Sequence, residues 1–143
     1  MRIRRPAMAF LAGAVLITAP LWAACSKGSA ATTSTPATRP SSPAKVAIVQ
    51  PKNGQTVTGS SVHLVVALKG AKIVRPTTTH IVPTEGHLHV FVDGRIVSMN
   101  YGLTQTVGGL KPGLHVLKVE FVASDHLPFD PQVFTETTFT VRA

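Results

Sequence analysis

Apolar and polar residues alternate along several short stretches between residues 45 and 143. The pattern is clearest over residues 62–68, 87–92 and 115–122, where every second side chain is aliphatic or aromatic. A period of two is typical of β-strands that bury one face. No stretch of useful length has the 3.6-residue period of an amphipathic helix. We therefore predict an all-β domain over residues 45–143.

Turn residues divide this region into short strands. Asn53-Gly54, Asp93-Gly94 and Lys111-Pro112-Gly113 each lie between alternating runs, and Asp93-Gly94 is a strong signal for a two-residue hairpin. We expect strands at residues 45–50, 62–68, 87–93, 95–99, 104–110, 115–122 and 133–141. Six or seven short strands with turns of this kind in about 100 residues are typical of an antiparallel sandwich.

Two segments of this region resemble a known fold family. VFVDGRIV (residues 90–97) and LKPGLHVLKVEF (residues 110–121) are similar to segments of bacterial immunoglobulin-like domains, in which such a turn leads into a core strand. The resemblance covers most of residues 45–143 and implies a single immunoglobulin-like β-sandwich. It implies a fold and no particular function.

The first 24 residues have the pattern of an export signal. Three arginines precede an uncharged and largely apolar stretch over residues 6–24. The stretch ends in Trp22-Ala23-Ala24-Cys25, which resembles a bacterial lipoprotein signal, although Trp22 stands where that pattern usually has Leu. The resemblance implies that residues 1–24 are removed and that Cys25 carries a lipid anchor such as palmitate. It places the protein on the extracytoplasmic face of a bacterial cell membrane. Cleavage near Ala23 without lipidation, or an uncleaved anchor, remain as alternatives.

Residues 25–44 form the expected connection between Cys25 and the domain. Residues 26–44 read SKGSAATTSTPATRPSSPA, with no aliphatic run and no periodicity. Such a composition cannot bury a core, so we predict a disordered linker that holds the domain away from the membrane.

Charge and cysteine content narrow the classes of function. The formal net charge of +8 over 143 residues would ordinarily raise nucleic acid as a partner. Five of the 14 Lys and Arg residues precede residue 45, however, so the domain has nine against six acidic residues. We therefore expect no nucleic-acid partner. The single Cys excludes an internal disulfide framework and cysteine-rich zinc sites, and it leaves the domain no thiolate for a blue-copper site.

Histidines are the candidate functional residues of the domain. His87 and His89 are two apart on one predicted strand, so both point to the outer face while their aliphatic neighbours point to the core. Two such imidazoles can chelate Cu or Zn, but a useful site needs three or four ligands. His126 in the loop that follows could supply a third, with Asp125 or Asp130 as a carboxylate. The alternative is that His87 and His89 only hydrogen-bond to neighbouring loops.

The other three histidines are expected to have different roles. His115 shares the face of the core residues Leu117 and Val119, so we expect a hydrogen-bonded side chain within the core. His63 points outward by the same parity, and His80 lies in a loop bounded by prolines. Both are expected to be solvated.

A second resemblance combines the central strand with the end of the chain. GHLHVFVDG and ASDHLPFDPQVFTETTFTV together resemble an exported bacterial domain family of unknown function, with a His-rich strand and a His/Pro/Asp loop before the last strand. The matching positions are Gly86, His87, His89, Asp93, His126, Pro128, Asp130 and Pro131. Leu88 stands where some relatives have a further histidine, which weakens an inherited metal site. The family implies no reaction.

These observations favour a protein that is not an enzyme. We expect a lipid-anchored cell-envelope protein whose immunoglobulin-like domain binds a partner, which would be another envelope protein. The alternative is a Cu- or Zn-binding protein that uses His87, His89 and His126, with Asp130. Ser124-Asp125-His126 does not suggest a hydrolase, because neighbours in sequence seldom assemble a catalytic triad.

Overall fold

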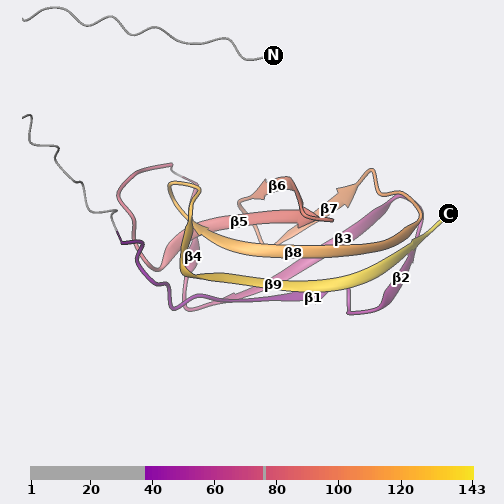
Figure 1. Ribbon diagram of the computed structural model, residues 1–143, viewed down its shortest axis with the longest axis horizontal. Coiled ribbons are helices and arrows are strands. Elements are labelled where there is room, and N and C mark those ends of the chain that lie inside the picture. The colour runs from indigo at the N-terminus through magenta and orange to yellow at the C-terminus, as the bar shows by residue number, and fades with distance from the viewer. Residues whose placement is uncertain (1–37, 76) are drawn as a thin grey trace, which may run out of the picture. The chain divides into compact units, whose positions relative to one another are not determined.

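The computed structural model describes residues 38–75 and 77–143, which form nine β-strands (Figure 1). The strands are β1 Lys45–Gln50, β2 Gln55–Thr58, β3 Ser61–Lys69, β4 Lys72–Ile73, β5 Glu85–Val92, β6 Arg95–Asn100, β7 Thr104–Gly108, β8 Gly113–Ala123 and β9 Pro128–Arg142. Within these ranges no helix is long and apolar enough to cross a membrane. The predicted signal over residues 1–24, Cys25 and the linker up to residue 37 lie outside the described residues.

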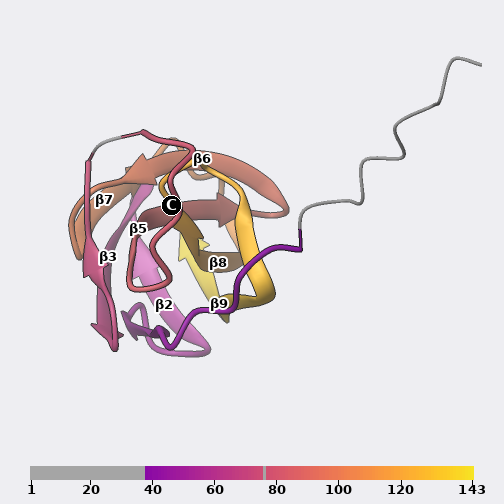
Figure 2. The same ribbon diagram turned by 90° about the vertical axis from the view of Figure 1, so that its left-hand side faces the viewer.

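The strands form two sheets, which Figure 2 shows from one end. One sheet has the order β1-β3-β7, and the other has the order β2-β9-β8-β5-β4, with β6 paired to β5. The prediction of an all-β, immunoglobulin-like sandwich is confirmed. The short strands β2 and β4 pair in parallel with β9 and β5, so the sheets are not purely antiparallel.

The core lies between the inner faces of the two sheets. β5 contributes Leu88 and Val90, and the neighbouring strand β8 contributes Leu117, Val119 and Phe121, all of them fully buried. The opposite sheet supplies Val62, Leu64, Val66 and Val107. The period of two in the sequence therefore identified the buried face of these strands correctly.

The Asp93-Gly94 turn between β5 and β6 has the predicted form. Asp93 has φ +50° and Gly94 has φ +78°, as a two-residue hairpin turn of type I′ requires. The turn reverses the chain with little strain because Asp and Gly both tolerate positive φ.

At its other end, β5 starts close to the end of β8. Gly86 pairs with Ala123, and a side chain at Gly86 would collide with the carbonyl oxygen of Val122. Glycine is therefore required for this close approach of two backbones. The contact places His87 beside the short connection from β8 to β9, residues 124–127.

The folded domain extends further toward the N-terminus than the predicted boundary at residue 45. Ala44 is buried, and the Ser42 hydroxyl donates a 2.6 Å hydrogen bond to the carbonyl oxygen of Pro83. The backbone N–H of Asp130 donates to the carbonyl oxygen of Pro40 at 3.0 Å. The prediction of a disordered linker is therefore wrong for residues 39–44. It failed because contacts made by single polar groups leave no periodic pattern in the sequence.

Candidate metal centre

Three histidine rings converge on the outer face of the larger sheet. Nε2 of His87 lies 3.1 Å from Nε2 of His89 and 2.9 Å from Nδ1 of His126. One nitrogen from each ring lies within 4.8 Å of the other two. The structure therefore brings together the three histidines that the sequence singled out.

Two elements position these rings. His87 and His89 extend from β5 on the same face, as their spacing predicted, and His126 lies in the connection between β8 and β9. His126 has φ +66°, a left-handed conformation that is uncommon for a residue with a side chain. Its N–H donates to the carbonyl oxygen of Ala123 at 3.0 Å, which closes the connection into a tight turn. The turn directs Nδ1 of His126 at His87.

Two of the three rings, those of His87 and His89, are buried although they lie on the outer face of a sheet, and His126 is half-buried. His87 is fully buried and His89 is 7% exposed. The ring of Tyr101 lies 5.0 Å from the ring of His87, and the ring of His126 lies 4.3 Å from it, between centroids. The β8–β9 connection and Tyr101 therefore shield the cluster from water.

The hydrogen-bonding capacity of His87 is poorly used. A neutral imidazole has one donor and one acceptor nitrogen. Nε2 of His87, however, faces two imidazole nitrogens, and its Nδ1 is buried with no hydrogen-bond partner among the described residues. If Nδ1 carries the proton, a buried donor is left unpaired. If Nε2 carries it, Nε2 can donate fully to only one of its two neighbours. Neither tautomer satisfies the whole cluster.

The electrostatics favour the neutral forms of His87 and His89. Burial, followed by the charges of His126 and His89, lowers the pKa of His87 to about 4. Burial and then His126 also lower the pKa of His89, while Glu120 acts in the opposite direction. Neutral imidazoles with exposed lone pairs are the form that binds a metal ion.

A buried carboxylate adjoins the cluster, and sequence reasoning did not assign it to the site. Glu120 of β8 pairs with His89 across the sheet and is 4% exposed. Its Oε2 lies 3.3 Å from Nζ of Lys118, whereas its Oε1 is buried and has no hydrogen-bond partner in the part of the chain that the structure describes. A buried negative charge with an unpaired oxygen is costly unless a positive charge is nearby. Lys118 supplies that charge at Oε2, and Oε1 is the oxygen that a further cation or donor could contact.

The carboxylates considered from the sequence do not join the three rings. Asp130 is exposed and is not part of the cluster. Asp125 forms a bidentate ion pair with Arg39, and the hydrogen bonds from Arg39 lower the pKa of Asp125. The second nitrogen of His126, Nε2, instead lies 3.1 Å from the hydroxyl oxygen of Thr77. Cys25 lies outside the described residues.

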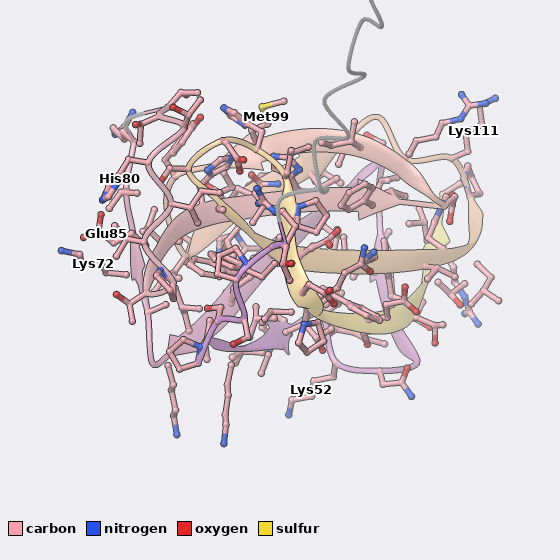
Figure 3. All side chains as sticks on the ribbon, turned by 60° about the vertical axis from the view of Figure 1, so that its left-hand side comes forward. Lys52, Lys72, His80, Glu85, Met99 and Lys111 are labelled. Carbon is pink, nitrogen blue, oxygen red and sulfur yellow. The ribbon has the colours of Figure 1, made fainter. Side chains whose placement is uncertain are left out.

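The remaining histidines are separate from this site. His63 and His80 are exposed, as predicted. His115 is buried on the core side of β8, where Nδ1 lies 2.8 Å from the carboxylate of Asp93 and Nε2 lies 2.7 Å from the carbonyl oxygen of Lys111. The predicted role of His115 as a hydrogen-bonded core residue is confirmed. Lys111, the partner of His115, and Glu85, the first residue of the strand that carries His87 and His89, lie at opposite ends of the domain (Figure 3).

The two separations from Nε2 of His87 suit ligands of a single transition-metal ion. With bonds of about 2.0–2.1 Å, cis ligand nitrogens lie about 2.9 Å apart in a square-planar site and about 3.3 Å apart in a tetrahedral one. The two measured separations, 3.1 and 2.9 Å, fall in this range. Imidazole is a suitable ligand for both Zn and Cu.

Several solved structures are similar to this domain, each at less than 20% sequence identity. The sequence matches no protein-family model and no curated protein at a significant level. Similar solved structures include fibronectin(III)-like modules of CbhA from Clostridium thermocellum, at 17% identity, a TM-score of 0.47 and coverage of 67% of this chain and 93% of that one. The PKD domain of human KIAA0319 has 15% identity, a TM-score of 0.44 and coverage of 78% and 91%. CopC from Methylosinus trichosporium has 18% identity, a TM-score of 0.36 and coverage of 68% and 92%.

Proposed function

We propose that this domain binds one Cu or Zn ion through Nε2 of His87, Nε2 of His89 and Nδ1 of His126. The observation that carries the proposal is the convergence of these three nitrogens, whose hydrogen-bonding partners among the described residues are one another. Three protein ligands leave room for a further ligand, such as water. The proposed function is binding rather than catalysis.

The contacts of each ring support a metal site over a set of structural hydrogen bonds. Structural histidines direct their nitrogens at carbonyl or carboxylate oxygens, as His115 does. Nε2 of His87 faces only other imidazole nitrogens. A metal ion would satisfy all three lone pairs at once. The contact of His126 Nε2 with Thr77 would then orient that ring, as outer hydrogen bonds do in known metal sites.

A metal titration of the full chain tests the proposal. The protein is loaded with Cu(II) or Zn(II) against a chromophoric chelator, alongside the variants H126A and H63A. We expect one equivalent to bind to the wild type and to H63A, since His63 is exposed and outside the cluster. H126A is expected to lose affinity by more than about 100-fold, because changes outside the ligand shell alone cost about 10- to 100-fold. Wild-type protein that retains neither metal after dialysis would overturn the proposal.

We further propose that the domain is exported and attached to the membrane by a lipid at Cys25. The proposal is based on the arginines, the apolar stretch and the Ala23-Ala24-Cys25 ending in the sequence. Labelling of bacterial cells with a radioactive fatty acid tests it. The wild type should be labelled and C25A should not, and an unlabelled wild type would contradict the anchor without affecting the metal site.

A further inference from the structure

We propose that Arg39 is the positioning residue of the metal site and that docking of the segment 39–44 is coupled to metal binding. Arg39 precedes the first strand by six residues and is far in sequence from every proposed ligand. The inference rests on the proposed function, because it concerns how His126 is held for a metal ion. It assigns a role to a segment that the sequence pattern had placed in a linker.

One guanidinium group contacts both sides of His126. Nη1 of Arg39 donates to Oδ2 of Asp125 at 2.6 Å, and Nη2 donates to Oδ1 of Asp125 at 3.0 Å and to the carbonyl oxygen of Leu127 at 2.9 Å. Nε donates to the carbonyl oxygen of Pro128 at 2.9 Å. Asp125 and Leu127 are the immediate neighbours of His126. Arg39 therefore fixes the backbone of the turn that presents this ligand.

The turn needs such support because His126 has an unfavourable backbone conformation. Its φ of +66° persists only where surrounding contacts determine it. The N–H of Leu127 donates to Oδ1 of Asp125 at 3.2 Å, so the carboxylate that Arg39 holds also braces the turn from within. Removing the guanidinium would leave the carboxylate and two carbonyl oxygens without these donors. The turn would then sample conformations in which Nδ1 of His126 no longer faces His87.

Burial makes the ion pair between Arg39 and Asp125 stronger than an ordinary surface ion pair. The side chains of Arg39 and Asp125 are 25% and 16% exposed. A planar guanidinium can donate in parallel to both oxygens of a carboxylate, which the ammonium group of lysine cannot do. Lysine at position 39 would keep the charge but lose the geometry. A comparison of R39K with the wild type therefore distinguishes a positioning role of the guanidinium from simple charge attraction.

The same segment has further attachments to the domain. Its contacts with Asp130 and Pro83, described above, extend the docking from Arg39 to Ser42. Gly70 lies under Pro43, whose carbonyl oxygen would be 2.6 Å from a Cβ at this position. Residues 39–44 therefore follow a defined path that ends at the histidine turn. Since coupling is reciprocal, metal binding to His126 should tighten this docking as much as docking improves metal affinity.

The test measures Zn(II) affinity of the full chain for the wild type, R39Q, R39K and the control K45Q. Lys45, the first residue of β1, is an exposed cation that directly follows this segment. We expect R39Q to weaken Zn(II) binding by about 10- to 100-fold, as outer-shell changes do, and K45Q to leave it unchanged. R39K should resemble R39Q more than the wild type. Wild-type affinity in both Arg39 variants, or an equal loss in K45Q, would overturn the inference.

Hydrogen exchange in the same proteins distinguishes this inference from the proposed function. Zn(II) should slow exchange at the N–H groups of Leu127 and Asp130 in the wild type, and this protection should be reduced in R39Q. A wild type that binds no Zn(II) or Cu(II) would overturn both proposals. A wild type that binds Zn(II) with no added protection in the turn would overturn the coupling alone. If R39Q is unfolded by circular dichroism, R39K provides the same comparison.

Discussion

Two groups of buried histidine lie toward opposite ends of β8, and their surroundings differ in one decisive respect. At the start of the strand, both nitrogens of His115 face oxygen acceptors, the carboxylate of Asp93 and the carbonyl of Lys111. Near its other end, one nitrogen from each of His87, His89 and His126 faces the other two. Burial alone therefore does not define the role of a histidine. The partner atoms decide whether the ring takes up a proton or offers a lone pair.

The pKa directions follow from these partners. The carbonyl of Lys111 and then the carboxylate of Asp93 raise the pKa of His115, because both accept hydrogen bonds from the charged ring. Hydrogen bonds from Val116 and His115 in turn lower the pKa of Asp93. In the cluster, burial and neighbouring imidazoles lower the pKa of His87. One site is built to hold a proton and the other to exclude it.

The largest effect that distinguishes the two sites should be on metal affinity. H87A removes the central ligand and should weaken Cu(II) or Zn(II) binding by more than about 100-fold, since even outer-shell changes cost about 10- to 100-fold. H115Q should leave the affinity unchanged because His115 lies outside the cluster. Competition with a chromophoric chelator measures both. Equal losses in the two variants would remove the distinction between the sites.

In the metal-free protein, a change at His115 should lower the stability more than a change at His87, the reverse of their effects on metal affinity. H115L removes two hydrogen bonds and should lower the free energy of unfolding by about 1–3 kcal/mol. H87L should cost less than about 1 kcal/mol, since it also removes a buried nitrogen that has no partner. Urea unfolding in the presence of a chelator gives both values. A larger loss in H87L than in H115L would show that the cluster is a structural hydrogen-bond network.

The roles of two carboxylates, Glu120 and Asp130, can also be distinguished by their effects on Zn(II) affinity. Glu120 is buried beside His89 and compensates positive charge, so E120Q should weaken Zn(II) binding by about tenfold. Asp130 is exposed and outside the cluster, so D130N serves as the matched control and should have wild-type affinity. Chelator competition detects a change of this size. A loss confined to D130N would restore Asp130 as the acidic ligand.

The pH dependence of stability should have opposite signs at the two sites. The raised pKa of His115 contributes stability fully below its unfolded value of 6.5, and the contribution is lost as pH rises through the folded value. The lowered pKa of His87 has the opposite effect. As pH falls from 6.5 toward its folded value of about 4, the unfolded chain takes up a proton that the folded protein does not, and the free energy of unfolding decreases. For His87, the shift from 6.5 to about 4 corresponds to a loss of roughly 3 kcal/mol at the acid end of this range.

Urea midpoints of the metal-free protein between pH 4 and 9 measure these two effects. H115Q should lose the decline on the alkaline side, and H87L should lessen the decline on the acid side. If either variant has the pH profile of the wild type, the pKa shift assigned to that histidine is incorrect.

The sequence predicted the parts of this structure that depend on local pattern. Alternation identified the core faces, Asp93-Gly94 identified a hairpin, and the spacing of His87 and His89 placed both rings on one face. Glu120 could not be found this way, because a polar residue that alternates with core residues is expected to face water. Its burial depends on neighbours contributed by other strands. Arg39 left no signal either, since its role depends on a turn 86 residues away.

X-ray absorption at the Zn edge of the Zn-loaded full chain most directly tests whether the histidine cluster is a metal site. We predict scattering from three imidazole rings, with nitrogens at about 2.0–2.1 Å from the metal. The H126A protein, loaded at a higher Zn(II) concentration, should show one imidazole fewer. Scattering from oxygen or nitrogen ligands with one imidazole or none in the wild type would contradict the assignment of His87, His89 and His126 as the ligands.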